Sequence, residues 1–192
     1  MKPTNRFSRW TVLALATTFA VPAVQASNAT TINTPATFSV AHNAAQASNL
    51  LKEVRTLAMQ VSSDTDLLAL STGSNRLHWE THLTYLNQAK DNINQIGAHL
   101  ETLKGMRGSV HPWQQEAIDR IHASSLTAAR HTESALSHLN ENKRWLFAPS
   151  YTRDLNAIQE HSEQVRETAN NFLNYASTKD KLGALQERLA YE

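Results

Sequence analysis

The feature that most constrains this 192-residue chain is a repeated spacing of apolar and small residues in alternating steps of three and four. Such steps keep side chains on one stripe of an α-helix, so each run predicts a helix with one buried face. Four runs of this kind occur, beginning at Val40, Trp79, Ile118 and Tyr151. The sequence therefore predicts four long helices whose stripes pack against one another.

The segments between these runs are rich in residues that end helices. They read STGSN at 71–75, KGMRGSVHP at 104–112 and NKRWLFAPS at 142–150. Pro112 and Pro149 stand where helices should begin, and the chain shows no strand-like alternation and only five glycines. We therefore predict an all-α fold, an antiparallel up-down-up-down four-helix bundle. The leucines at 182, 185 and 189 either lengthen the fourth helix or form a short fifth one.

The first 26 residues have the pattern of a secretory signal peptide. Lys2, Arg6 and Arg9 precede an apolar run that is too short to span a bilayer, and the segment ends in V-Q-A. We expect cleavage after Ala26, a flexible polar tail at 27–37 and a single helical domain at 38–192. The mature protein would then be periplasmic or secreted, with no transmembrane segment.

Composition excludes several classes of function. The absence of cysteine rules out disulfides, thiolate zinc sites, iron–sulfur clusters and covalently attached haem. Without the three bases of the leader, the formal net charge of +1 becomes −2. Because nucleic-acid binding needs a concentrated basic face, we do not expect a nucleic-acid partner.

The stretch HWETH, residues 78 to 82, places two histidines four residues apart around a glutamate. It is not the zinc-protease pattern H-E-x-x-H, because Glu80 would point away from a metal held by His78 and His82. No glutamate precedes a histidine by three residues, as di-iron bundles require. A serine hydrolase is a weaker alternative, since no G-x-S-x-G turn is present. We therefore expect no enzymatic activity.

The histidines nevertheless fall at one end of the predicted bundle. In an antiparallel arrangement His78 would lie level with His138 and His82 within about a turn of His131, with His161 at a similar height. Neutral imidazoles at this end could bind Zn, Cu or Ni, so the candidate metal ligands are His78, His82, His131 and His138. The same residues could instead charge in mild acid and act as a pH sensor. A third interpretation has His82 in the core and the others in solvent.

Non-covalent haem is a further alternative, with His82 and either Met59 or Met106 as axial ligands. It is the weakest of these cofactor hypotheses, because both methionines should lie at other heights along the bundle than His82. Our leading expectation is a protein without a cofactor.

The segment RWLFAPSY at 144–151 concentrates aromatic residues at a helix connection. Trp145 and Phe147 could cap the end of the bundle or form an exposed surface that binds a partner. We expect a non-enzymatic protein, monomeric or homodimeric, that binds a protein or another envelope component. The alternative is a metal- or pH-responsive bundle that uses the four histidines.

The predicted leader has a direct test. When the whole chain is expressed in a secreting bacterial host, the exported protein should begin at Ser27 on N-terminal sequencing. Recovery of the chain with its leader intact, embedded in the membrane, would show that these residues are an anchor.

Overall fold

The computed structural model describes residues 36–72, 78–143 and 145–190, with side chains from residue 42 onward. It contains the long helices α1 (Ala36–Thr72), α2 (Trp79–Gly105), α3 (Pro112–Glu141) and α4 (Pro149–Ala190), and the short 3-10 helix η1 (Arg107–Ser109). No residue in these ranges lies in a strand. The predicted all-α fold with four long helices is confirmed. The predicted signal peptide, and the tail as far as residue 35, lie outside the described residues.

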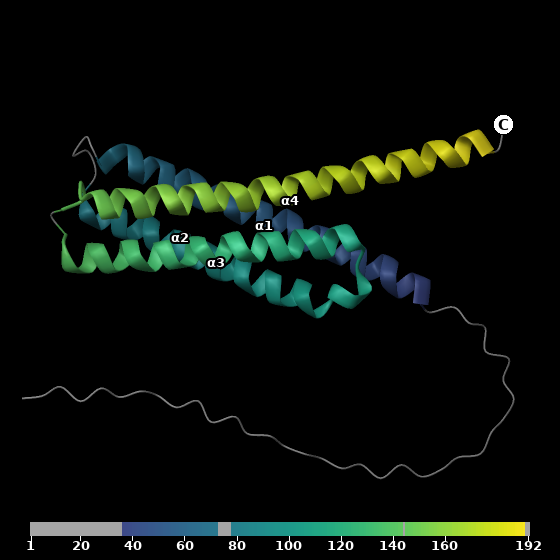
Figure 1. Ribbon diagram of the computed structural model, residues 1–192, viewed down its shortest axis with the longest axis horizontal. Coiled ribbons are helices and arrows are strands. Elements are labelled where there is room, and N and C mark those ends of the chain that lie inside the picture. Colours follow the sequence, from purple (N-terminus) through teal and green to yellow (C-terminus); the bar gives the residue numbers. More distant parts are fainter. Residues whose placement is uncertain (1–35, 73–77, 144, 191–192) are drawn as a thin grey trace, which may run out of the picture. The chain divides into compact units, whose positions relative to one another are not determined.

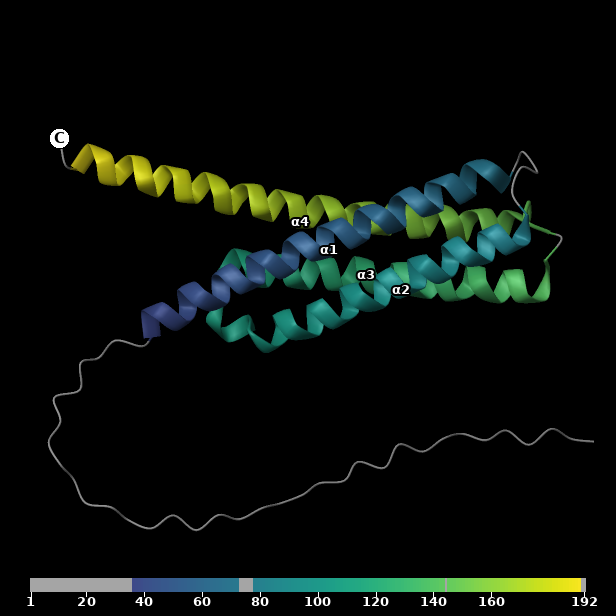
Figure 2. The same ribbon diagram turned by 180° about the vertical axis from the view of Figure 1, so that it is seen from behind.

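Each long helix packs mainly along two others. The neighbours of α1 are α2 and α4, and α3 packs against the same two helices (Figures 1 and 2). Side-chain contacts show which helix ends meet: Ser71 of α1 contacts His82 of α2, and Tyr151 of α4 contacts both His82 and His138 of α3. The end of α1, the start of α2, the end of α3 and the start of α4 therefore lie together.

The buried residues follow the predicted stripes closely. In α2 all the residues of the predicted stripe from His82 onward are buried: His82, Leu86, Ala89, Ile93, Ile96, Leu100 and Leu103. In α3 the whole predicted stripe is buried: Ile118, Ile121, Ser125, Ala128, Thr132, Ala135 and Leu139. The apolar core forms two clusters, one around Tyr151 and Leu155, the other around Leu51 and Ile118. Small polar residues are buried along the stripes as well, among them Ser62, Ser125, Thr132 and Ser162.

Helix starts at Pro112 and Pro149 match the sequence prediction. A proline suits the first turn because its missing N–H would have no helical partner there. At the start of α3, the side chain of Gln114 accepts a hydrogen bond from the His111 N–H (3.0 Å). The same side chain donates to the carbonyl of Ala44 in α1 (2.9 Å), which explains why a glutamine is fully buried.

Helix α4 continues without a break from Pro149 to Ala190, so the leucines at 182, 185 and 189 lengthen the fourth helix. Its buried stripe ends at Ala169, and every residue from Ser177 to Ala190 is exposed. Within the described part of the chain, no helix is apolar over enough length to cross a bilayer.

Packing along the stripes predicts where a truncation should matter. Leu51 is fully buried in the core, so Leu51→Ala should lower the free energy of unfolding by about 2–5 kcal/mol. Leu126 is 46% exposed, and the control Leu126→Ala should change it by less than about 0.5 kcal/mol. Urea denaturation followed by circular dichroism measures both. Equal effects of the two substitutions would contradict the assignment of the core.

Candidate functional site

The most constrained polar group of the structure is the imidazole of His82. The residue is fully buried and both ring nitrogens have partners: Nδ1 lies 2.9 Å from the hydroxyl of Tyr151, and Nε2 lies 3.3 Å from that of Ser71. Burial lowers the pKa of His82 from its ordinary value of 6.5. The histidine is therefore held in its neutral form at neutral pH.

The hydrogen bonds around His82 run in one direction. The Ser71 hydroxyl donates to the carbonyl of Leu68 (2.7 Å), so its oxygen accepts from the Nε2–H of His82. Nδ1 of the neutral ring is then the acceptor, and the Tyr151 hydroxyl donates to it. Burial raises the pKa of Tyr151, which keeps its hydroxyl protonated as this arrangement requires. A second proton on His82 would remove that acceptor.

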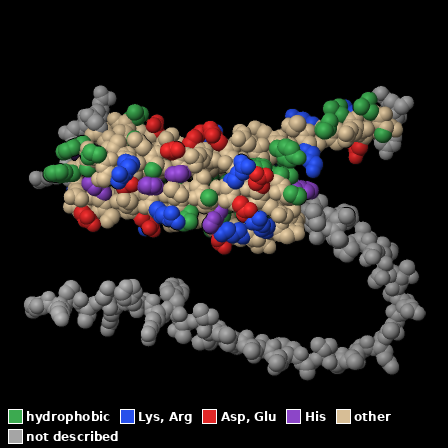
Figure 3. Space-filling view, in the orientation of Figure 1, with side chains coloured by type: hydrophobic (Ala, Val, Ile, Leu, Met, Phe, Trp, Pro, Cys, Tyr) green, Lys and Arg blue, Asp and Glu red, His purple; other side chains and the backbone are tan. Residues whose placement is uncertain are grey.

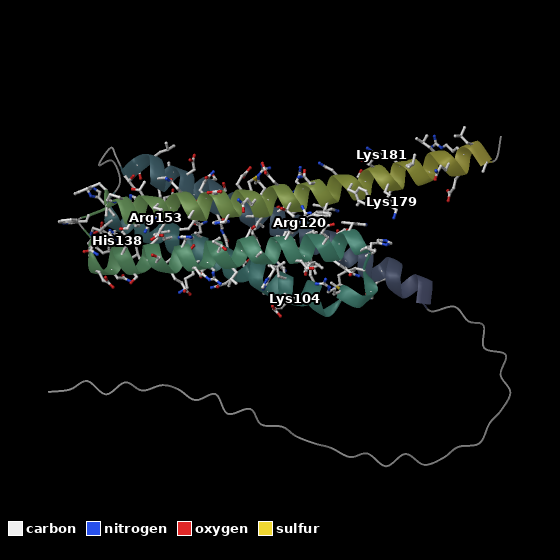
Figure 4. The ribbon with its side chains drawn as sticks, in the orientation of Figure 1. Lys104, Arg120, His138, Arg153, Lys179 and Lys181 are labelled. Carbon is white, nitrogen blue, oxygen red and sulfur yellow. The ribbon has the colours of Figure 1, made fainter. Side chains whose placement is uncertain are left out.

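Tyr151 also contacts His138. The two rings stack with centroids 5.1 Å apart, and Nε2–H of His138 donates to the carbonyl of Trp145 (3.0 Å). His138 therefore joins the buried tyrosine to the connection between α3 and α4. Figure 4 places His138 at the end of the bundle where this connection lies. Tyr151 was predicted only as a core residue, and nothing in the sequence pattern indicated its two histidine partners.

His131 takes part in a separate group between α3 and α4. Its Nδ1 lies 2.9 Å from Asp154, a nearly buried carboxylate that also accepts from the Ser134 hydroxyl (2.6 Å). The ring of His131 stacks on that of His161 at 6.3 Å. The similar height expected for these two histidines agrees with this contact. Asp154 was missed, because a carboxylate beside an apolar stripe is usually solvated.

The structure separates the two histidines of HWETH. His78 precedes α2 in an extended conformation with its side chain exposed, whereas His82 lies within the helix and is buried. The backbone explains the difference, because the carbonyl of His78 accepts the first N–H bonds of the helix, from Thr81 and His82. The two imidazoles therefore occupy different environments.

The four predicted metal ligands do not converge. No group of three or more histidine, aspartate or glutamate side chains within the described ranges is placed to hold a metal ion. Both nitrogens of His82 are already hydrogen-bonded, which also leaves none for haem iron. Of the proposed haem partners, Met59 is 53% exposed, and Met106 packs against the core cluster that does not contain Tyr151. The metal and haem hypotheses have no support from this geometry.

Among the described residues, Trp145 and Phe147 have the most exposed aromatic side chains, at 62% and 67%. Their rings stack on each other with centroids 6.1 Å apart. Leu146, between them, turns inward and packs against the core. Apolar side chains gather at this end in Figure 3. We call Trp145 and Phe147 the aromatic pair. The sequence left open whether these residues cap the end of the bundle or form an exposed surface, and in the structure both side chains are exposed.

Comparison of the chain with protein-family models, with curated proteins and with solved structures finds no match.

Burial of His82 predicts a dependence of stability on pH. Because the pKa is lower in the folded chain than the 6.5 of an unfolded histidine, unfolding takes up a proton in mild acid. The free energy of unfolding therefore does not depend on the protonation of this histidine above about pH 7. It decreases as the pH falls from about 6.5 to the pKa of folded His82, by at most about 1.4 kcal/mol per pH unit. Urea denaturation at a series of pH values should show this slope.

Two variants identify the group responsible. His82→Gln should flatten the slope in this window, whereas His78→Gln, at an exposed histidine of the same stretch, should leave it unchanged. If the parent and His82→Gln show the same slope, the proton is taken up elsewhere.

Proposed function

We propose that this chain is a non-enzymatic helical protein that works by binding a protein or another envelope component through the aromatic pair. The observation that carries the proposal is the exposure of two large stacked rings, Trp145 and Phe147, at one connection. Tryptophan and other aromatic side chains supply much of the energy of protein interfaces, because they bury a large area with few rotatable bonds. Two large rings exposed to solvent side by side favour the interpretation that a partner covers this surface when it binds.

The connection that carries the aromatic pair is held in place by three contacts. Leu146 packs into the core, the Trp145 N–H donates to the carbonyl of Asn142 (2.9 Å), and the Trp145 carbonyl accepts from His138 (3.0 Å). Nearby, the ammonium of Lys143 lies 4.2 Å from the centre of the Trp79 ring. A surface ordered before binding loses less conformational entropy when a partner arrives, which favours recognition.

The arrangement of the helices is part of the proposal. We interpret the fold as an antiparallel up-down-up-down bundle, because each helix packs on two others and the ends joined by short connections meet through Ser71, His82, His138 and Tyr151. We further propose that the signal-like leader directs the chain to the periplasm or outside the cell. A monomer or a homodimer suits four stripes that pack on one another.

A second candidate function is a response to mild acid. It is favoured by the buried His82, whose protonation would remove the acceptor of the Tyr151 hydroxyl beside the connection that carries the aromatic pair. Acid would then loosen the end of the bundle where we place partner binding. The pH series described above tests this candidate separately from partner binding.

The partner-binding proposal predicts the effect of removing the pair. The double variant Trp145→Ala, Phe147→Ala should lose partner capture, because each truncation in the centre of an interface typically costs about 2 kcal/mol or more. Its free energy of unfolding should change by less than about 1 kcal/mol, since both rings are mostly exposed. Crosslinking in the exported fraction of the native host, followed by affinity purification, measures capture.

Leu126→Ala is the matched control, an exposed apolar residue on α3 outside the connection. It should capture the same proteins as the parent chain. If the double variant does so too, the aromatic pair is not the binding surface.

A further inference from the structure

The last part of α4 forms a second apolar surface, distinct from the aromatic pair. Residues 177–190, which we call the free segment, continue the helix and are exposed at every position. Figure 1 shows the end of α4 extending past the start of α3, and Figure 2 shows the same from behind. Three large side chains here are more than half exposed: Leu182, Leu185 and Leu189, at 56%, 54% and 71%. A helix surrounded only by water gains no stability from large apolar side chains such as these.

The three leucines form a stripe on a different face from the buried one. They follow one another in steps of three and four, and Tyr175, 53% exposed, begins the same line seven residues before Leu182. At 3.6 residues per turn, the centre of this stripe lies roughly 150° around the helix from the buried residues Ile158–Ala169. The leucines therefore do not continue the core stripe; they face away from it.

Charged residues are sorted around the leucine stripe. Lys181 and Arg188 lie on one side of it and Lys179 on the other, each roughly 70–95° from its centre. Figure 4 shows Lys179 and Lys181 on opposite sides of α4. Asp180 and Glu187 fall roughly 170° from the centre, on the far face. Bases thus border the apolar face, and acids occupy the face opposite to it.

We propose that the free segment lies along an anionic lipid surface, with the leucine stripe in the hydrocarbon boundary and the flanking bases at the headgroups. This pattern is typical of helices that lie on a membrane, because long basic side chains can bury their methylene stems and keep their charges among phosphates. The acidic residues remain in water. The inference stands independently of the aromatic pair.

A second copy of the chain fits the same surface less well. The described residues that border the stripe include three bases and no acid, so two stripes packed together would bring like charges along one seam. A protein partner is also less favoured, because leucine is under-represented among residues that dominate protein interfaces. An anionic bilayer supplies both the apolar phase and the negative charge along the whole segment.

Flotation with lipid vesicles tests the proposal. The exported chain should float with vesicles that contain phosphatidylglycerol and phosphatidylcholine, less with phosphatidylcholine alone, and less again at high salt. The triple variant Leu182→Ser, Leu185→Ser, Leu189→Ser should bind about tenfold more weakly or worse. The triple variant Lys179→Gln, Lys181→Gln, Arg188→Gln should lose the preference for anionic vesicles.

The controls separate this segment from the rest of the chain. Leu126→Ser removes an exposed leucine of α3, and Asp180→Asn with Glu187→Gln alters the far face, so neither should weaken flotation. A tryptophan reporter gives a second reading: Leu185→Trp should shift its emission to the blue on adding vesicles, and Ala184→Trp, on another face, should not. Circular dichroism checks that each variant remains helical.

Three results would overturn the proposal. The first is a parent chain that stays with the aqueous phase in every vesicle preparation. The second is a leucine variant that floats as well as the parent, which would assign lipid binding to another part of the chain. The third is a dimer in sedimentation that the leucine variant loses, without any flotation of the parent, which would identify a second copy as the occupant.

Discussion

The hydrogen bond from Tyr151 to His82 joins the contacts that hold one end of all four helices together. Tyr151 lies in the first turn of α4 and donates to Nδ1 of His82 in α2. Ser71 of α1 accepts from Nε2–H of the same ring, and His138 of α3 stacks on the tyrosine. Because these groups are buried or partly buried, each hydrogen bond that is lost would leave a polar atom without water or partner. The network therefore fixes which helix ends meet, which apolar stripes alone do not specify.

The helices and their buried faces could be predicted from the sequence, because a spacing of three and four residues reports directly on one side of a helix. Leu86, Ile118 and Leu155 are buried as that spacing requires. Gln114 and Asp154 were missed for a common reason: each is buried through partners on another helix or a neighbouring turn. Such partners become visible only when the helices are placed together, although Gln114 two residues after Pro112 is a known cap position.

The candidate site was predictable in location and not in detail. Counting residues from each turn of an antiparallel bundle placed His131 and His161 at similar heights, and their rings stack. The same counting could not show that His78 lies outside α2. A shift of one residue in the position of a helix boundary changes the direction of the side chain there. Nor could the counting identify Tyr151 as the shared partner of His82 and His138, because that depends on how far each helix is rotated about its axis.

The unbroken course of α4 has a mechanical consequence. A helix of 42 residues is about 60 Å long. The connection with Trp145 and Phe147 precedes its first residue, and Leu189 is next to its last. The length of α4 therefore sets the distance between a partner bound at the aromatic pair and a surface bound by the free segment. The helix acts as a spacer of fixed length, and inserting or deleting turns between Val165 and Ser177 would change that distance in steps of about 5 Å.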